Sequence, residues 1–222
     1  MAVFPAVARS QEKPVPRQPS FVMTNEIKDQ GGQTQDQHVV VFHEGRIYDF
    51  SKTQPRFVTV YDLSGDRVVL LDRNTQGKAE IGTEALLQRT TQAQVAATAR
   101  PNAEELGFHV QVATSEDYSR FATRYGRIQY EVMAEPCDDP LVAIAYSQFV
   151  DWASRLGVAR SMGPPPFARM SVNAEIVKQS RIPVLTRMTI EHNNDQQQTL
   201  AATHRKSALT EDLLAKVNEA RG

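Results

Sequence analysis

The chain contains several pairs of β-rich runs, each joined by a short turn, and this feature constrains its fold most strongly. A β-rich run, a turn that contains glycine or asparagine, and a second β-rich run together indicate a β-hairpin. Four hairpins are expected, with arms at residues 38–42 and 46–50, 57–63 and 67–72, 118–125 and 127–134, and 184–192 and 197–207. Such a series of hairpins predicts an antiparallel sheet.

Two further segments are expected to add strands to this sheet. Phe21, Met23 and Ile27 begin a first strand, and residues 28–37 form a polar connection to the first hairpin. Residues 108–112 alternate apolar and polar side chains, as a strand with one buried face does.

The clearest helix begins at Pro140. Asp139 suits the N-cap, proline suits the first helical position, and Gly157 suits the end of the helix. Its apolar side chains fall on one stripe, which a helix lying on a sheet would bury. That stripe comprises Leu141, Ala145, Phe149, Trp152 and Leu156.

Other helices are expected between and after the hairpins. Residues 83–98 have apolar side chains at helical spacing, with Thr83 as the N-cap. Residues 102–107 predict a single helical turn. One more helix follows the prolines at 164–166, and a last one begins after Thr210.

Helices inserted after the second and third hairpins, and one at the C-terminus, predict an α+β fold: a mainly antiparallel curved sheet built of hairpins and packed against several helices. The 222 residues are enough to bury a core without metals or disulfides. Residues 21–222 are expected to form a single α+β domain. Residues 1–20, with several prolines and no periodic apolar face, are expected to be a flexible arm.

The start of this arm leaves two interpretations open. Residues 1–8 are apolar and end in Ala6-Val7-Ala8, ahead of Arg9-Ser10-Gln11. An apolar segment that closes on an A-x-A site is typical of a secretory signal peptide, although the basic residues that precede one are missing. The segment is therefore either the remnant of a signal peptide, which predicts a periplasmic or secreted protein, or the tail of a cytoplasmic protein.

Charge and hydropathy exclude two classes of function. The 25 basic and 26 acidic residues give a net charge of −1, and the basic residues are scattered along the chain. Nucleic-acid-binding proteins usually concentrate basic residues on one face, so no nucleic-acid partner is expected. No apolar run approaches the ~20 residues of a membrane-spanning helix.

No pattern in the sequence predicts a catalytic, cofactor or metal site. His38 and His43 lie an odd number of positions apart on one strand, so they face opposite sides of the sheet. His192 and His204 are too far apart on the last hairpin to share a zinc ion. The single cysteine, Cys137, precedes two aspartates, which disfavour a reactive thiolate. We expect no catalytic residue, no metal and no cofactor.

The segment from His38 to Asp72 resembles a known family. Its hairpins, VVVFHEGRIYDF and RFVTVYDLSGDRVVLLD, are similar to the consecutive hairpins of the bacterial periplasmic lipoprotein-carrier fold, an open antiparallel half-barrel whose mouth is closed by helices. The likeness lies in the cadence of the hairpins, and the chain departs from the family in lacking its N-terminal helix. The segment equally resembles uncharacterised secreted bacterial proteins. The resemblance implies an apolar cavity between a curved sheet and its helices.

These observations predict an exported, non-catalytic module that binds or carries an apolar small molecule or a lipidated partner protein. The candidate binding residues are Phe149, Trp152 and Phe167. One alternative is an enzyme with a dispersed site, in which His109 or His192 lies in a cleft beside a carboxylate of perturbed pKa. Another is a plain interaction domain, with an exposed apolar patch and no cavity. The sequence predicts no oligomeric state.

Overall fold

The computed structural model describes residues 18–99, 106–108, 110–160, 165–192 and 196–221. The strands are β1 (Phe21–Asp29), β2 (Thr34–His43), β3 (Arg46–Ser51), β4 (Phe57–Asp62), β5 (Arg67–Asp72), β6 (Gly77–Gly82), β7 (Ala113–Thr114), β8 (Arg120–Tyr125), β9 (Ile128–Pro136), β10 (Arg181–Glu191) and β11 (Gln197–Ser207). The helices are α1 (Thr83–Thr98), α2 (Pro140–Ala159), α3 (Phe167–Lys178) and α4 (Glu211–Arg221), with a short 3-10 turn η1 (Leu63–Gly65) after β4.

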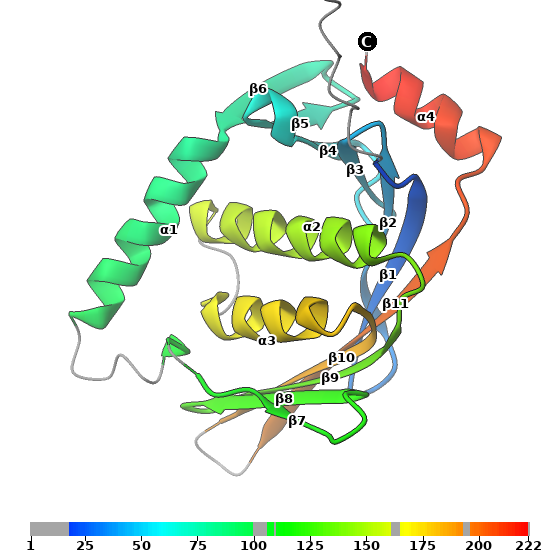
Figure 1. Ribbon diagram of the computed structural model, residues 1–222. Coiled ribbons are helices and arrows are strands. Elements are labelled where there is room, and N and C mark those ends of the chain that lie inside the picture. The colour runs from blue at the N-terminus through cyan, green and yellow to red at the C-terminus, as the bar shows by residue number, and fades with distance from the viewer. Residues whose placement is uncertain (1–17, 100–105, 109, 161–164, 193–195, 222) are drawn as a thin grey trace, which may run out of the picture.

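Within the described residues, eleven strands form one antiparallel sheet in the order β6-β5-β4-β3-β2-β1-β11-β10-β9-β8-β7. The sheet curves around α2 and α3 but does not close into a barrel (Figure 1). The first strand β1 pairs with both β2 and β11, so it joins the two halves of the sheet. The predicted α+β fold class, a curved antiparallel sheet packed against helices, is confirmed.

The four predicted hairpins are all present, as the pairs β2–β3, β4–β5, β8–β9 and β10–β11. Local turn chemistry accounts for the first of them. Glu44 and Gly45 both have positive φ angles, 47° and 74°. Two consecutive residues with positive φ form the tight turn that matches the twist of the flanking strands.

The structure corrects three strand predictions. The connection expected over residues 28–37 is much shorter, because β1 continues to Asp29 and the polar start of β2 pairs with it. A strand was not expected at Gly77–Gly82, whose exposed side chains leave no apolar alternation to detect. The strand expected at 108–112 is wrong: only Ala113 and Thr114 pair with β8, whereas Val110 and Val112 contribute to packing.

The helices expected at 83–98, after Pro140, after the prolines at 164–166 and after Thr210 are present, with two errors in capping. Gly157 does not end α2, which continues to Ala159 and has Arg160 as its C-cap. Thr83 is the first residue of α1 rather than its N-cap, which is Gly82 and makes no side-chain hydrogen bond. At the start of α2, Asp139 is the N-cap and accepts a hydrogen bond from the backbone N–H of Leu141. The expected signal segment, residues 102–105 of the turn expected at 102–107, and His109 lie outside the described residues.

The helices lie on both faces of the sheet (Figure 1). On the concave face, α1 and α2 pack on the half formed by β1–β5, and α3 packs on β8 and β9. On the convex face, α4 inserts Val217 among side chains of β1–β5. Alternation along the strands supplies both cores: Phe42 contributes to the concave cluster, and its neighbour Val41 contributes to the convex one.

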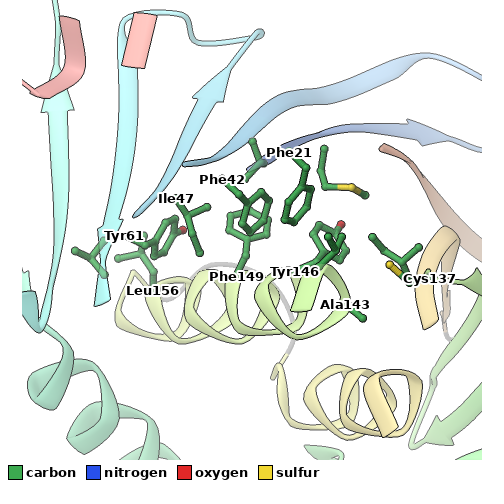
Figure 2. Packing of buried hydrophobic residues seen from close by; sticks show 14 of the residues in the cluster. Phe21, Phe42, Ile47, Tyr61, Cys137, Ala143, Tyr146, Phe149 and Leu156 are labelled. Atoms are coloured by element: carbon green, nitrogen blue, oxygen red, sulfur yellow. The ribbon is translucent and has the colours of Figure 1, made fainter. Parts of the chain in front are cut away.

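Figure 2 shows the concave cluster between α2 and the sheet. Aromatic rings dominate it. Phe21 and Phe42 stack with their centroids 4.1 Å apart, and Phe149 meets Phe42 and Tyr61 edge-on at 6.1 and 5.6 Å. Cys137 is buried in the same cluster.

Candidate functional site

Helix α2 has more apolar surface than the sheet covers. Residues 141–145 are all apolar and therefore spread around the helix rather than along one stripe. Val142 and Ala143 are buried, whereas Leu141 and Ile144 are 39% and 44% exposed. The predicted buried stripe is thus wrong at Leu141, since Val142 and Tyr146 take the buried positions in the first turns.

The exposed side chains of α2 line a groove of about 400 Å³ where β2 turns into β3. We call it the mouth groove. Its apolar walls are formed by Leu141, Ile144 and Ala145 from α2, Phe42 and Ile47 from the sheet, and Leu63 from η1. Polar residues surround them: Gln18, His43, Arg46, Ser64 and Gln148. An apolar wall with a polar rim is typical of a site for an apolar ligand.

None of the three predicted binding residues lines this groove, and only Phe149 and Trp152 lie near it. Phe149 is 7% exposed and contacts the groove residue Phe42 from inside the core. Trp152 is partly buried against the same cluster, with the guanidinium of Arg155 5.6 Å from the centre of its indole. Phe167 packs elsewhere, against Phe108 at a centroid distance of 4.1 Å. The structure therefore brings Phe149 and Trp152 to one cluster and leaves Phe167 apart.

A polar network joins α2 to the sheet behind the aromatic cluster. The hydroxyl of Tyr146 lies 3.1 Å from Oδ1 of Asn25 on β1 and 2.9 Å from Nδ1 of His204 on β11. Nε2 of His204 lies 3.0 Å from Oγ1 of Thr186 on β10. Both ring nitrogens of His204 thus have partners, and burial, followed by the positive charge of Arg169, lowers the pKa of His204 to about 3. His204 is neutral at physiological pH.

Arg169 on α3, close to this polar network, has an unsatisfied hydrogen-bond donor. Its Nη1 is buried and has no hydrogen-bond partner among the described residues. Tyr130, Tyr146 and Asp151 are close enough to affect its pKa, which burial lowers. The carboxylate of Asp151 accepts a hydrogen bond from Nδ2 of Asn173 at 2.9 Å rather than from Arg169. A buried polar group without a partner is uncommon and marks a place where function is to be sought.

The histidine–carboxylate arrangement expected of an enzyme occurs at a residue that the sequence did not suggest. His38 lies with Nδ1 2.6 Å from Asp49 and Nε2 2.9 Å from Asp36. Burial favours its neutral form, but the hydrogen bond and charge of Asp49, and then those of Asp36, outweigh this and raise the pKa of His38 to about 9. A histidine that is protonated and bound at both nitrogens is neither a general base nor a metal ligand. His192 is exposed.

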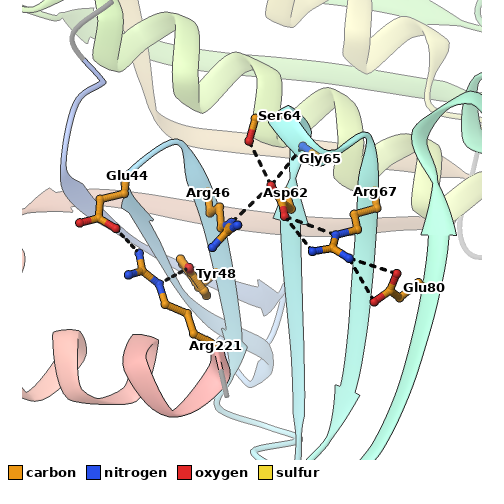
Figure 3. A network of polar contacts seen from close by, with 9 residues as sticks. All are labelled: Glu44, Arg46, Tyr48, Asp62, Ser64, Gly65, Arg67, Glu80 and Arg221. Carbon is orange, nitrogen blue, oxygen red and sulfur yellow. Dashed lines mark hydrogen bonds and ion pairs between the residues drawn. The ribbon is translucent and has the colours of Figure 1, made fainter. Parts of the chain in front are cut away.

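The convex face has a second hollow, of about 600 Å³, between the end of α4 and strands β3–β6. Figure 3 shows its polar network. Asp62, 4% exposed, forms ion pairs with Arg46 and Arg67, both at 3.3 Å. Arg221 of α4 donates to the hydroxyl of Tyr48 at 2.8 Å and to Glu44 at 2.7 Å. Since each arginine in Figure 3 already has an acidic partner, this network anchors α4 and offers no free charge to a ligand.

Sequence reasoning missed both the mouth groove and Arg169. Five consecutive apolar residues at the start of α2 were a usable signal, because no helix can bury all five against one sheet. Nothing in the sequence distinguishes Arg169 from other helical arginines.

Two further findings bear on the class of site. Within the ranges that the structure describes, no three histidine, cysteine or acidic side chains are arranged to hold a metal ion. The same part of the chain contains no helix with the length and apolar character needed to cross a membrane. No protein-family model matches this chain, and no curated protein matches it in sequence.

Proposed function

We propose that the protein binds an apolar small molecule, or the acyl chain of a lipidated partner protein, in the mouth groove and acts as its carrier. The observation that carries the proposal is the pair Leu141 and Ile144, which remain exposed and line a groove with the core residue Phe42. Covering exposed apolar surface stabilises a complex by about 25 cal/mol per Å², so an apolar ligand gains most where such surface is concave.

The overall architecture supports the same proposal. An open curved sheet that holds α2 and α3 on its concave face agrees with the half-barrel that the hairpins of residues 38–72 resemble. The mouth groove lies at the edge of this arrangement, where Leu141 and Ile144 of α2 face Phe42 and Ile47 of the sheet.

The proposed location is the periplasm or the exterior of the cell, with the cytoplasm as the alternative. The apolar residues 1–8 and the A-x-A site support export. Cell fractionation with an antibody to the chain tests it: export predicts a periplasmic or secreted form that begins after Ala8, and an uncleaved cytoplasmic form would contradict it.

The binding proposal is tested with Ile144→Asp, which places a carboxylate in the mouth groove at a side chain that is already 44% exposed. Val95→Asp is the matched control, because Val95 is a 63% exposed apolar residue on α1 outside the groove. The readout is the fluorescence of the apolar probe N-phenyl-1-naphthylamine, which increases when the probe leaves water.

The wild type and Val95→Asp should bind the probe with equal affinity, and Ile144→Asp should bind it at least about ten-fold more weakly, which corresponds to about 1.4 kcal/mol. Thermal unfolding checks that both variants are folded. Equal binding by all three proteins, or no binding by the wild type, would contradict the proposal. Weak probe binding combined with capture of an extended peptide in the groove would favour the interaction-domain alternative.

A further inference from the structure

We propose that Arg169 binds the carboxylate of the carried molecule, so that the ligand is a fatty acid rather than a neutral lipid. This inference rests on the proposed function and specifies the class of substrate. It assigns the polar end of the ligand to α3 and the apolar end to the mouth groove.

Arg169 has donor capacity that the described residues do not use. A guanidinium remains protonated under all physiological conditions and has five N–H donors in a planar fork. Nη1 of Arg169 is buried and has no hydrogen-bond partner among the described residues. Arg169 as a whole is partly buried, and a buried N–H donor without a partner destabilises the fold that contains it. The fold retains this cost at Arg169, as expected of a residue whose partner arrives from outside.

The acidic group that affects the pKa of Arg169, Asp151, has another hydrogen-bond partner. Asp151 accepts a hydrogen bond from Asn173, whose amide also donates to Oγ and the backbone carbonyl of Ser147. Asn173 is 2% exposed, so this arrangement is fixed within the α2–α3 contact. Asp151 is therefore held by α2 and α3, and no ion pair within 4.0 Å forms between it and Arg169 in the described residues.

The charges around Arg169 favour a ligand with a single negative charge. The other titratable groups around Arg169 are the phenols of Tyr130 and Tyr146, Asp151 and the neutral His204. Arg169 is thus the sole cation of this set. Asp151 contributes a negative charge to the same set. A carboxylate carries one negative charge and fits the two parallel N–H groups of a guanidinium. A phosphate monoester carries about −1.5 to −2 and would need further cations.

Tyr146 and Phe42 connect the surroundings of Arg169 with the mouth groove. Tyr146 interacts with Arg169 and also lies 6.3 Å from Phe42, centroid to centroid. Phe42 lines the mouth groove. An acyl chain whose carboxylate is at Arg169 would therefore pass Tyr146 and Phe42 and reach the groove. Because aromatic side chains fill the space between α2 and the sheet (Figure 2), its entry requires α2 to move away from the sheet.

The test compares two ligands that differ only in the end group, dodecanoic acid and dodecan-1-ol, by calorimetric titration of the full chain. The wild type should bind the acid at least about ten-fold more tightly than the alcohol. Arg169→Met should bind both with the affinity that the wild type has for the alcohol. Arg187→Met, which removes an exposed arginine of β10, is the control and should keep the preference.

Two further measurements distinguish a binding role of Arg169 from a structural one. Arg169→Lys keeps the charge without the fork and should retain part of the preference. Without ligand, Arg169→Met should be at least as stable to urea as the wild type, since it removes a buried donor that has no hydrogen-bond partner among the described residues. A large loss of stability would assign Arg169 a structural role instead.

The possible results distinguish the carrier function of the mouth groove from carboxylate binding by Arg169. Equal binding of acid and alcohol by the wild type, or a preference that survives Arg169→Met, would overturn the assignment of Arg169 and leave the carrier proposal standing. No binding of either ligand would overturn both. Tighter binding of dodecyl phosphate than of dodecanoic acid, dependent on Arg169, would overturn the choice of a carboxylate.

Discussion

The hydroxyl of Tyr146 lies 2.9 Å from Nδ1 of His204, and this contact joins the N-terminal half of α2 to β11. Tyr146 is 2% exposed, so neither group can exchange this contact for water without moving the helix. The contact therefore holds α2 on the sheet, and the movement of α2 that ligand entry requires has to break it.

Tyr146→Phe should destabilise the protein by about 0.5 to 1.5 kcal/mol, because it removes the hydrogen bonds of the Tyr146 hydroxyl while Asn25 and His204 still lie 2.9 Å from each other. Tyr118→Phe, at a residue that is 42% exposed, is the matched control and should have little effect. Urea unfolding measures both. A loss no larger than that of the control would show that α2 is held by apolar packing alone.

His204 predicts a loss of stability toward acid. Its folded pKa of about 3 lies below the ordinary value of 6.5, so the unfolded chain takes up a proton first as the pH falls. Its contribution is complete above pH 6.5 and should decrease by about 2 kcal/mol between pH 6.5 and pH 5. His204→Gln should flatten this part of the profile, and His192→Gln, at an exposed position, should not. An unchanged slope in His204→Gln would contradict the burial of a neutral imidazole.

His38 predicts a loss of stability toward alkali. Its folded pKa of about 9 lies above 6.5, so its contribution is complete below pH 6.5 and is lost as the pH rises toward 9. The full loss should reach up to about 3 kcal/mol. In His38→Gln the stability should vary less between pH 6.5 and 9, as followed by urea unfolding at each pH. A variant that retains the whole alkaline slope would disprove the paired, protonated state of His38.

Phe149 and Trp152 should differ in their effect on stability. Phe149 is 7% exposed among aromatic rings, so Phe149→Ala should cost about 3 to 5 kcal/mol. Trp152 is only partly buried, so Trp152→Ala should cost less. If α2 moves on binding, the fluorescence of Trp152, the only tryptophan, should also change when dodecanoic acid is added. A Trp152 emission that is indifferent to every amphiphile, with a stability loss as large as that of Phe149→Ala, would make Trp152 a core residue alone.

The sequence was most informative where local chemistry decides the structure. Asp139 and Pro140 start α2, and the glycine-bearing turns place the hairpins, because capping and turn formation depend on neighbours in the chain. Exposed strands such as Gly77–Gly82 escaped prediction, since backbone pairing holds them and their side chains show no periodicity.

The candidate site was less predictable, because it depends on contacts between distant segments. Whether Leu141 or Val142 faces the core depends on how α2 is rotated on the sheet, and helical spacing allowed both. The environment of Arg169 on α3 includes Tyr130 of β9, two residues of α2 and His204 of β11, which only the folded chain brings together. The candidates Phe149 and Trp152 lie beside the mouth groove, and their role in binding stays a prediction.

The most direct test of the central claim is native mass spectrometry of the full chain purified from the cells that naturally produce it. The account predicts a complex with one co-purified amphiphile in the wild type, and its loss in Ile144→Asp but not in Val95→Asp. A wild-type spectrum that contains only the ligand-free chain, or an adduct equally abundant in all three proteins, would contradict the claim that the mouth groove carries an apolar ligand.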